Sequence, residues 1–183
     1  MERVRIWMGV FITIVIGFAH TSAFASSQKL LNDLAESVSV QTAQPIIDAL
    51  WEDWINAHQS EDEKTLMASG MAAMGRGRLK EAEHIFGELI QKNPDFVEAW
   101  NKRATVRFML WKFEESRDDV LEVLSREPRH FGALSGLGMI YLRLGQMDEA
   151  LGTYENLRII FPASPEVQRY IPMLRKKLGL TNL

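Results

Sequence analysis

Three prolines of this 183-residue chain, Pro94, Pro128 and Pro162, follow one another at intervals of 34 residues. Proline interrupts a helix because it lacks the backbone N–H and its ring collides with the preceding turn. A fixed interval of this length indicates one repeated unit of secondary structure, stacked copy upon copy. The spacing therefore predicts three units without insertions, at residues 63–96, 97–130 and 131–164.

The third unit shows most clearly what each copy should fold into. Apolar and small residues recur at helical spacing before Gly145 and again after it. Gly138 and Ala150 are small enough to let two helices approach closely, and Tyr141 and Tyr154 can fill the space around them. The pattern predicts two antiparallel helices that are joined at Gly145.

The three units resemble the tetratricopeptide repeat family, whose copies carry W-x2-L-G-x2-Y, then A-x3-F, then P. Besides the three prolines, the matching residues are Gly70, Ala82, Phe86, Trp100, Leu137, Gly138, Tyr141 and Ala150. The resemblance implies an all-α fold, a right-handed α-α superhelix (a TPR solenoid) of three helix pairs. More loosely, residues 99–145 resemble exported repeat proteins of alphaproteobacteria.

The middle unit departs most from the family pattern. Arg103 and Arg107 stand where Leu and Tyr are usual, and Trp111 stands at the bend that glycine occupies in the other two units. A buried arginine without a partner is costly, so we expect Asp118 and Asp119 on the following helix to pair with the two arginines.

The first 25 residues have the order of a bacterial secretory signal peptide. Arg3 and Arg5 precede the apolar run 6–18, and Ala23-Phe24-Ala25 offers small residues at both positions that a signal peptidase inspects. We expect cleavage after Ala25 and export to the periplasm. The alternative is an uncleaved membrane anchor, but the apolar run is short against the roughly 20 residues that span a bilayer.

Residues 26–62 should form an N-terminal helical cap. Helical spacing over Lys29–Val38 predicts one helix, and Pro45 is expected to begin a second that ends near His58. Trp51 and Trp54 lie one turn apart on the second helix. They could cover the exposed end of the first repeat, or they could form an aromatic patch for a partner.

Residues 165–183 should form a C-terminal capping helix, because a solenoid needs an end helix with a polar outer face. Ser164 is the expected N-cap and Pro165 the first helical residue. Pro172 should kink or restart this helix. The cations at 175–177 suit its last turn, where they complement the helix dipole, with anionic lipid as the alternative contact.

The family resemblance also implies a concave groove lined by the first helix of each pair. Members that grip a terminal carboxylate carry Lys and Asn at two first-repeat positions, where this chain has Met67 and Met71. Third-repeat places for basic residues hold Gly132 and Gly136, so this clamp is not expected. The groove residues carried over, with a neighbouring lysine, are Lys64, Met67, Met71, Met74, Asn101, Lys102, Thr105, Phe108, Ser135, Met139 and Leu142.

A methionine-rich floor with a polar patch around Asn101 suits an adaptable apolar surface. An amphipathic helix or apolar peptide would fit it as a partner. Alternatively, the helix over 46–55 fills the groove from within the chain.

Catalytic and metal-site signals are weak. The chain has no cysteine, no G-x-S-x-G serine and no phosphate-binding loop, and its formal charge of −3 does not favour nucleic acid. His58 with Glu61 and Asp62, and Glu127 with His130, only loosely match metal-ligand spacings. We therefore expect a non-enzymatic protein without a cofactor or metal.

The sequence supports three hypotheses about function. The first is a protein–protein interaction adaptor of the cell envelope that binds a peptide or helix in the groove, with Asn101 and Lys102 fixing its orientation. The second is a membrane-anchored structural subunit of an envelope complex. The third is a chaperone-like holdase for unfolded envelope proteins.

Overall fold

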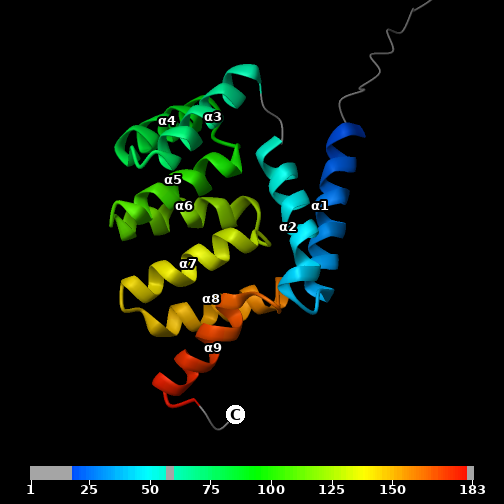
Figure 1. The fold of residues 1–183 in the computed structure, drawn as a ribbon, viewed down its shortest axis with the longest axis vertical. Helices are drawn as coiled ribbons and strands as arrows, with labels where there is room; N and C mark the ends of the chain where they lie inside the picture. Colours follow the sequence, from blue (N-terminus) through cyan, green and yellow to red (C-terminus); the bar gives the residue numbers. More distant parts are fainter. Residues whose placement is uncertain (1–17, 57–59, 181–183) are drawn as a thin grey trace, which may run out of the picture.

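The computed structural model describes residues 18–56 and 60–180, which form nine α-helices and no strand. Six of the helices form the repeated hairpins, two precede them and one follows (Figure 1). The helices are α1 (Phe18–Glu36), α2 (Val40–Asn56), α3 (Glu61–Gly75), α4 (Leu79–Lys92), α5 (Val97–Met109), α6 (Phe113–Arg126), α7 (Phe131–Arg143), α8 (Met147–Ile160) and α9 (Pro165–Lys177).

Helices α3 to α8 stack as three antiparallel hairpins, each packed on the next (Figure 1). The 34-residue interval reappears in the helix starts, because α5 begins at Val97 and α7 at Phe131. Pro94, Pro128 and Pro162 occupy equivalent turns after α4, α6 and α8. The predicted all-α superhelix of stacked helix pairs is therefore confirmed.

Small residues face aromatic rings within the outer hairpins. A β-carbon on Gly70 would lie 2.6 Å from the Phe86 ring, and one on Gly138 would lie 2.4 Å from the Tyr154 ring. Both rings are completely buried. The missing side chains are what allow these rings to lie against the facing helix at core packing density.

The three hairpin bends share one backbone conformation. Gly77 and Gly145 have φ angles of 72° and 76°, and Trp111 at the equivalent place has φ 64°. In each bend, paired backbone hydrogen bonds close the end of the first helix, as when Trp111 donates to the Phe108 carbonyl and Lys112 to that of Arg107.

The middle hairpin has a polar core, as expected, but only one of the two aspartates contributes. Asp119 is 2% exposed and accepts from Arg103 at 2.7 Å and Arg107 at 2.8 Å. Asp118 points instead to its neighbour Arg117. The prediction is confirmed for Asp119 and wrong for Asp118, which faces outward one position earlier on α6.

The N-terminal hairpin differs from its expected boundaries. Helix α1 ends at Glu36, so Val38 lies beyond it and is 88% exposed. Helix α2 begins at Val40, five residues before Pro45, because Ser39 and Thr42 cap it reciprocally through their side chains and backbone amides. The predicted end near His58 lies outside the described residues.

Neither tryptophan of α2 covers the first repeat. Trp54 is 8% exposed and contacts Phe131 of the third repeat, as does Trp51. One apolar core joins α1 and α2 to α7, α8 and α9. The N-terminal hairpin therefore lies along the side of the repeat stack (Figure 1), and the expectation that the tryptophans cover the end of the first repeat is wrong.

Helix α9 begins at the predicted residue, but it does not restart at Pro172 as predicted. Ser164 caps the helix through the Val167 amide and Pro165 occupies its first turn. Pro172 lies inside one continuous helix that runs to Lys177, so the predicted restart at this proline is wrong.

No helix in residues 18–56 and 60–180 is both long and apolar enough to cross a bilayer. Most of the predicted leader lies outside these residues, and its expected cleavage point after Ala25 falls within α1. Cleavage stays a prediction.

Candidate functional site

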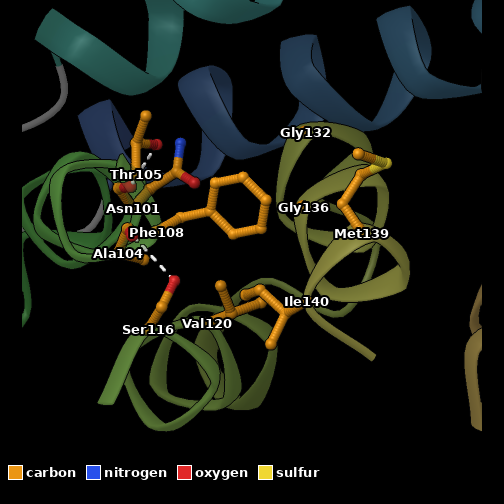
Figure 2. A pocket seen from close by; sticks show the side chains of 10 residues that line it. All are labelled: Asn101, Ala104, Thr105, Phe108, Ser116, Val120, Gly132, Gly136, Met139 and Ile140. Carbon is orange, nitrogen blue, oxygen red and sulfur yellow. Dashed lines mark hydrogen bonds between the residues drawn. The ribbon is translucent and has the colours of Figure 1, made fainter. Parts of the chain in front are cut away.

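A cavity of about 160 Å³ opens between α5 and α7, above α6 (Figure 2). We call it the α5–α7 pocket. A volume of this order accommodates a group about the size of benzene. The pocket is lined by Asn101, Ala104, Thr105 and Phe108 of α5, Ser116 and Val120 of α6, and Gly132, Gly136, Met139 and Ile140 of α7.

The two glycines of α7 have different surroundings. A β-carbon on Gly136 would meet no atom within 4 Å, so its absence contributes directly to the open space. A β-carbon on Gly132 would lie 2.6 Å from the Trp51 ring. Gly132 therefore admits the N-terminal hairpin, whereas Gly136 leaves room for a ligand.

Both hydroxyl groups that line the pocket are already hydrogen-bonded within the chain. The Ser116 hydroxyl donates to the Ala104 carbonyl at 2.7 Å, and the Thr105 hydroxyl to the Asn101 carbonyl at 2.9 Å. The remaining wall is mostly apolar, with the Phe108 ring reaching from α5 toward α7 (Figure 2). The pocket therefore suits an apolar side chain rather than an ion.

A buried polar cluster lies beside the pocket. Glu98 is completely buried, and its carboxylate contacts His130 Nε2 at 2.7 Å and Lys102 Nζ at 3.3 Å. Asn101 Nδ2 donates to both carboxylate oxygens at 3.2 Å. We call Glu98, Asn101, Lys102 and His130 the Glu98 cluster. It joins α5 to the start of α7.

The hydrogen bonds fix the tautomer of His130. Its Nδ1 accepts from the Ala133 amide at 3.0 Å, which caps α7, so the proton lies on Nε2 and is donated to Glu98. Burial alone would raise the pKa of the Glu98 carboxyl. The hydrogen bonds from His130 and Asn101, with the charge of the Lys102 ammonium, outweigh burial and hold this pKa below its usual value.

Helix α2 packs its two tryptophans onto this cluster. The Trp54 ring stacks on His130 with centroids 4.0 Å apart, and Lys102 Nζ lies 4.7 Å above the Trp51 ring. These contacts lie at the start of α7, where His130 is the N-cap, and in the second turn of α5. The N-terminal hairpin therefore covers one end of the α5–α7 surface and leaves the pocket beyond it open.

The structure brings together four of the predicted groove residues, Asn101, Thr105, Phe108 and Met139, as pocket walls. Met67 is 2% exposed in the core between α3, α4 and α5, so it is not available to a partner. Lys102 is bound within the Glu98 cluster. The predicted groove residues that do not line the pocket are Lys64, Met67, Met71, Met74, Lys102, Ser135 and Leu142.

The expected methionine floor is therefore not continuous. Met71 is 39% exposed on α3, and Met139 lies in the pocket on α7. Sequence reasoning missed Gly136, Ser116 and Val120 as lining residues. The run Gly132-x3-Gly136 was the available signal, because two glycines one turn apart on a groove-facing helix leave space there.

Among the residues that the structure describes, no three of His, Asp and Glu are grouped so that they could hold a metal ion. The loosely matching pair Glu127 and His130 is not a site, because the His130 ring is bonded to Glu98 and to a backbone amide. His58 lies outside the described residues.

Comparison with known proteins identifies the repeat. The family model for the tetratricopeptide repeat matches residues 67–124 and 110–165. A TPR repeat-containing protein of Rhizobium etli is 33% identical over 151 residues, which are 82% of this chain and 74% of that protein.

Solved structures agree on the fold. The first TPR domain of Spaghetti (RPAP3), bound to an HSP90 peptide, superposes with a TM-score of 0.63 at 21% identity, over 66% of this chain and 96% of that one. MamA superposes at 0.62 and 19% identity, over 75% and 84%. The TPR2B domain of yeast Sti1, in a complex with an Hsp70 peptide, superposes at 0.56 and 19%, over 66% and 98%.

The fold is that of a scaffold, which is typically non-enzymatic, and domains of this kind are typical protein–protein interaction modules. The proline interval, the glycine–aromatic contacts and the matched family model lead to one conclusion: this chain belongs to the tetratricopeptide repeat family.

Proposed function

We propose that this protein is a peptide-binding adaptor that seats one apolar side chain of its partner in the α5–α7 pocket. The observation that carries the proposal is a cavity of about 160 Å³ with apolar walls, kept open by Gly136. The volume suits an aliphatic or single-ring aromatic side chain. Burial of such a side chain contributes roughly 1.5–3 kcal/mol to binding.

Asn101 offers a way to orient the peptide backbone. Its Nδ2 donates to the Glu98 carboxylate. The side-chain oxygen Oδ1 accepts no hydrogen bond from the described residues and is therefore available as an acceptor. A backbone N–H of the partner can donate to this oxygen. The RPAP3 and Sti1 domains carry chaperone peptides, which supports peptide binding by this fold as well.

The N-terminal hairpin sets the limit of the site. Trp51 and Trp54 occupy the α5–α7 surface beside Gly132 and His130. A partner therefore reaches the pocket from the side of Phe108 and Met139. Because only a short surface is open, we expect recognition of a short segment rather than a long helix.

The test uses two glycines as a matched pair. Gly136 and Gly152 are both interior to helices, and a β-carbon on either meets no atom within 4 Å. Leucine at either position should favour the helix by somewhat under 1 kcal/mol. Only Gly136→Leu places its side chain in the pocket.

Short peptides selected from a displayed random library against the wild-type protein serve as probes. We expect at least one group of the selected peptides to bind Gly136→Leu at least about tenfold more weakly than wild type, while Gly152→Leu leaves the affinity of that group unchanged. Equal affinity of every selected peptide for wild type and Gly136→Leu would refute the pocket as a binding site. Circular dichroism melts verify that both variants fold.

We further propose that the adaptor works in the bacterial cell envelope. The support is the sequence of the first 25 residues, with two arginines, an uncharged apolar run and the Ala-Phe-Ala stretch. Amino-terminal sequencing of protein recovered from the native envelope should begin at Ser26. A protein that retains Met1 would instead support the membrane-anchored subunit.

A further inference from the structure

We propose that a second surface, separate from the α5–α7 pocket, docks an acidic peptide segment that carries an apolar side chain. The surface consists of Phe108, Met109, Trp111, Phe113 and Arg143, which together line a hollow of about 150 Å³ at the bend between α5 and α6. We call it the Trp111 corner. It adjoins the pocket through the Phe108 ring, which lines both.

The backbone of Trp111 points to a role other than folding. Its φ of 64° lies in the left-handed region, where the equivalent bends have Gly77 and Gly145. A bulky residue is strained there, and such strain is found where function requires a particular side chain. The Trp111 side chain is 73% exposed, so packing within the chain gives little in return.

Arg143 supplies the charge of the corner. Its guanidinium lies 5.9 Å from the Phe108 ring centroid and 5.8 Å from that of Trp111, so both rings hold it by cation–π contact. It forms no ion pair with a carboxylate in the described part of the chain. The nearby Lys112 ammonium, by contrast, is bound by Glu83 at 2.7 Å.

These groups define the chemistry of the occupant. A guanidinium without a carboxylate partner can bind an Asp or Glu side chain through two parallel N–H···O hydrogen bonds. Met109 is 45% exposed beside the Trp111 and Phe113 rings, which offers an adaptable apolar contact next to that charge. Tryptophan and arginine together are also the residues that most often dominate binding energy at interfaces.

The corner is therefore a site for a peptide segment in which Asp or Glu neighbours an apolar residue. Its recognition does not depend on the proposed use of the α5–α7 pocket, because Trp111 and Arg143 are not part of that cavity.

The experiment replaces two residues of the Trp111 corner by residues that should leave the fold intact. Trp111→Gly restores the residue that the other two bends carry, and Arg143→Gln removes only the charge. Ile159→Ser on α8, at a position 72% exposed, is the matched control for loss of an exposed apolar side chain. The probes are short peptides selected from a displayed random library on the full-length protein, then measured by fluorescence polarisation with and without added salt.

The proposal expects a group of selected peptides that share Asp or Glu beside an apolar residue. Their affinity should fall at least about tenfold on Trp111→Gly and on Arg143→Gln, fall with added salt, and stay unchanged on Ile159→Ser and on Gly136→Leu. Loss on Gly136→Leu alone would assign all binding to the pocket and overturn the corner.

Three other outcomes also overturn it: selection of no peptide dependent on Trp111, equal binding when the acidic residue is replaced by its amide, and concentration-dependent self-association that Trp111→Gly abolishes. The last would show that the corner contacts a second copy of the chain. Thermal melts separate these outcomes from misfolding, since we expect Trp111→Gly to melt no lower than wild type.

Discussion

At the scale of single residues, adjacent positions in this chain differ sharply in what they hold together. Asp119 and Asp118 are chemically identical neighbours on α6. Asp119 has its carboxylate between two arginines and is 2% exposed, whereas the Asp118 side chain is 63% exposed. The helical period, not the residue type, decides which aspartate is buried and paired with arginine.

This difference gives the first prediction. Asp119→Ala should lower the free energy of unfolding by about 3–5 kcal/mol, because it leaves Arg103 and Arg107 partly buried without their shared partner. Asp118→Ala should change it by less than about 0.5 kcal/mol. Urea unfolding followed by circular dichroism measures both. A similar loss for the two variants would show that the polar core of the middle repeat does not stabilise the fold.

The partners of Arg103 and Arg107 could be predicted from the sequence only in part. Two arginines at core positions required an acidic partner, and the following helix offered two adjacent candidates. The helical period separates them, because Asp119 lies three residues after Ser116 and four before Val123, on the buried face of α6. Glu83 of α4, which also pairs with Arg107 at 3.1 Å, comes from the preceding repeat and was not foreseen.

At the scale of helices, the N-terminal hairpin is held against the repeats by the Glu98 cluster. Lys102 ties this cluster to Trp51, and His130 ties it to Trp54. The pattern at 46–55 correctly indicated an amphipathic helix with one apolar face. It left two places open for that face, the end of the first repeat and the groove. The pattern could not decide between them, since the contacts on α7 are about 80 residues further along the chain.

The Glu98 cluster leads to a second prediction, about pH. The folded-state pKa of Glu98 lies below its usual value of 4.5, so its charge stabilises the fold above that pH and this contribution is lost as the pH falls through the folded pKa. At pH 7, Glu98→Gln should cost about 3 kcal/mol, since one member of a buried charged cluster is neutralised.

Wild type and Glu98→Gln should converge as the pH falls from about 4.5 through the folded pKa of Glu98, because the wild-type carboxyl of the folded protein becomes neutral there. Glu122→Gln, in an exposed pair with Arg126 on α6, is the control and should cost under about 1 kcal/mol at any pH. A difference between wild type and Glu98→Gln that stays constant with pH would show that the charge of Glu98 is not what stabilises the cluster.

At the scale of the whole molecule, the repeat period predicted the stacked helices well because it depends on local spacing. The Gly70–Phe86 contact of the first repeat recurs as the Gly138–Tyr154 contact of the third. The candidate site was predicted less well, because it forms between repeats. Family positions located Asn101, Thr105, Phe108 and Met139, but not the space beside Gly136. The alternative that the helix over 46–55 enters the groove holds in part, because Trp51 packs on Gly132.

The most direct test of binding in the α5–α7 pocket is to record methyl NMR spectra of the protein while a peptide selected for binding to it is added. If a partner side chain enters the α5–α7 pocket, the Met139 and Ile140 methyl signals should shift most. Those of Ile159 on α8 and Leu121 on α6, both exposed and outside the pocket, should stay in place. Shifts of the Ile159 or Leu121 signals with the Met139 signal unchanged would contradict binding in the α5–α7 pocket.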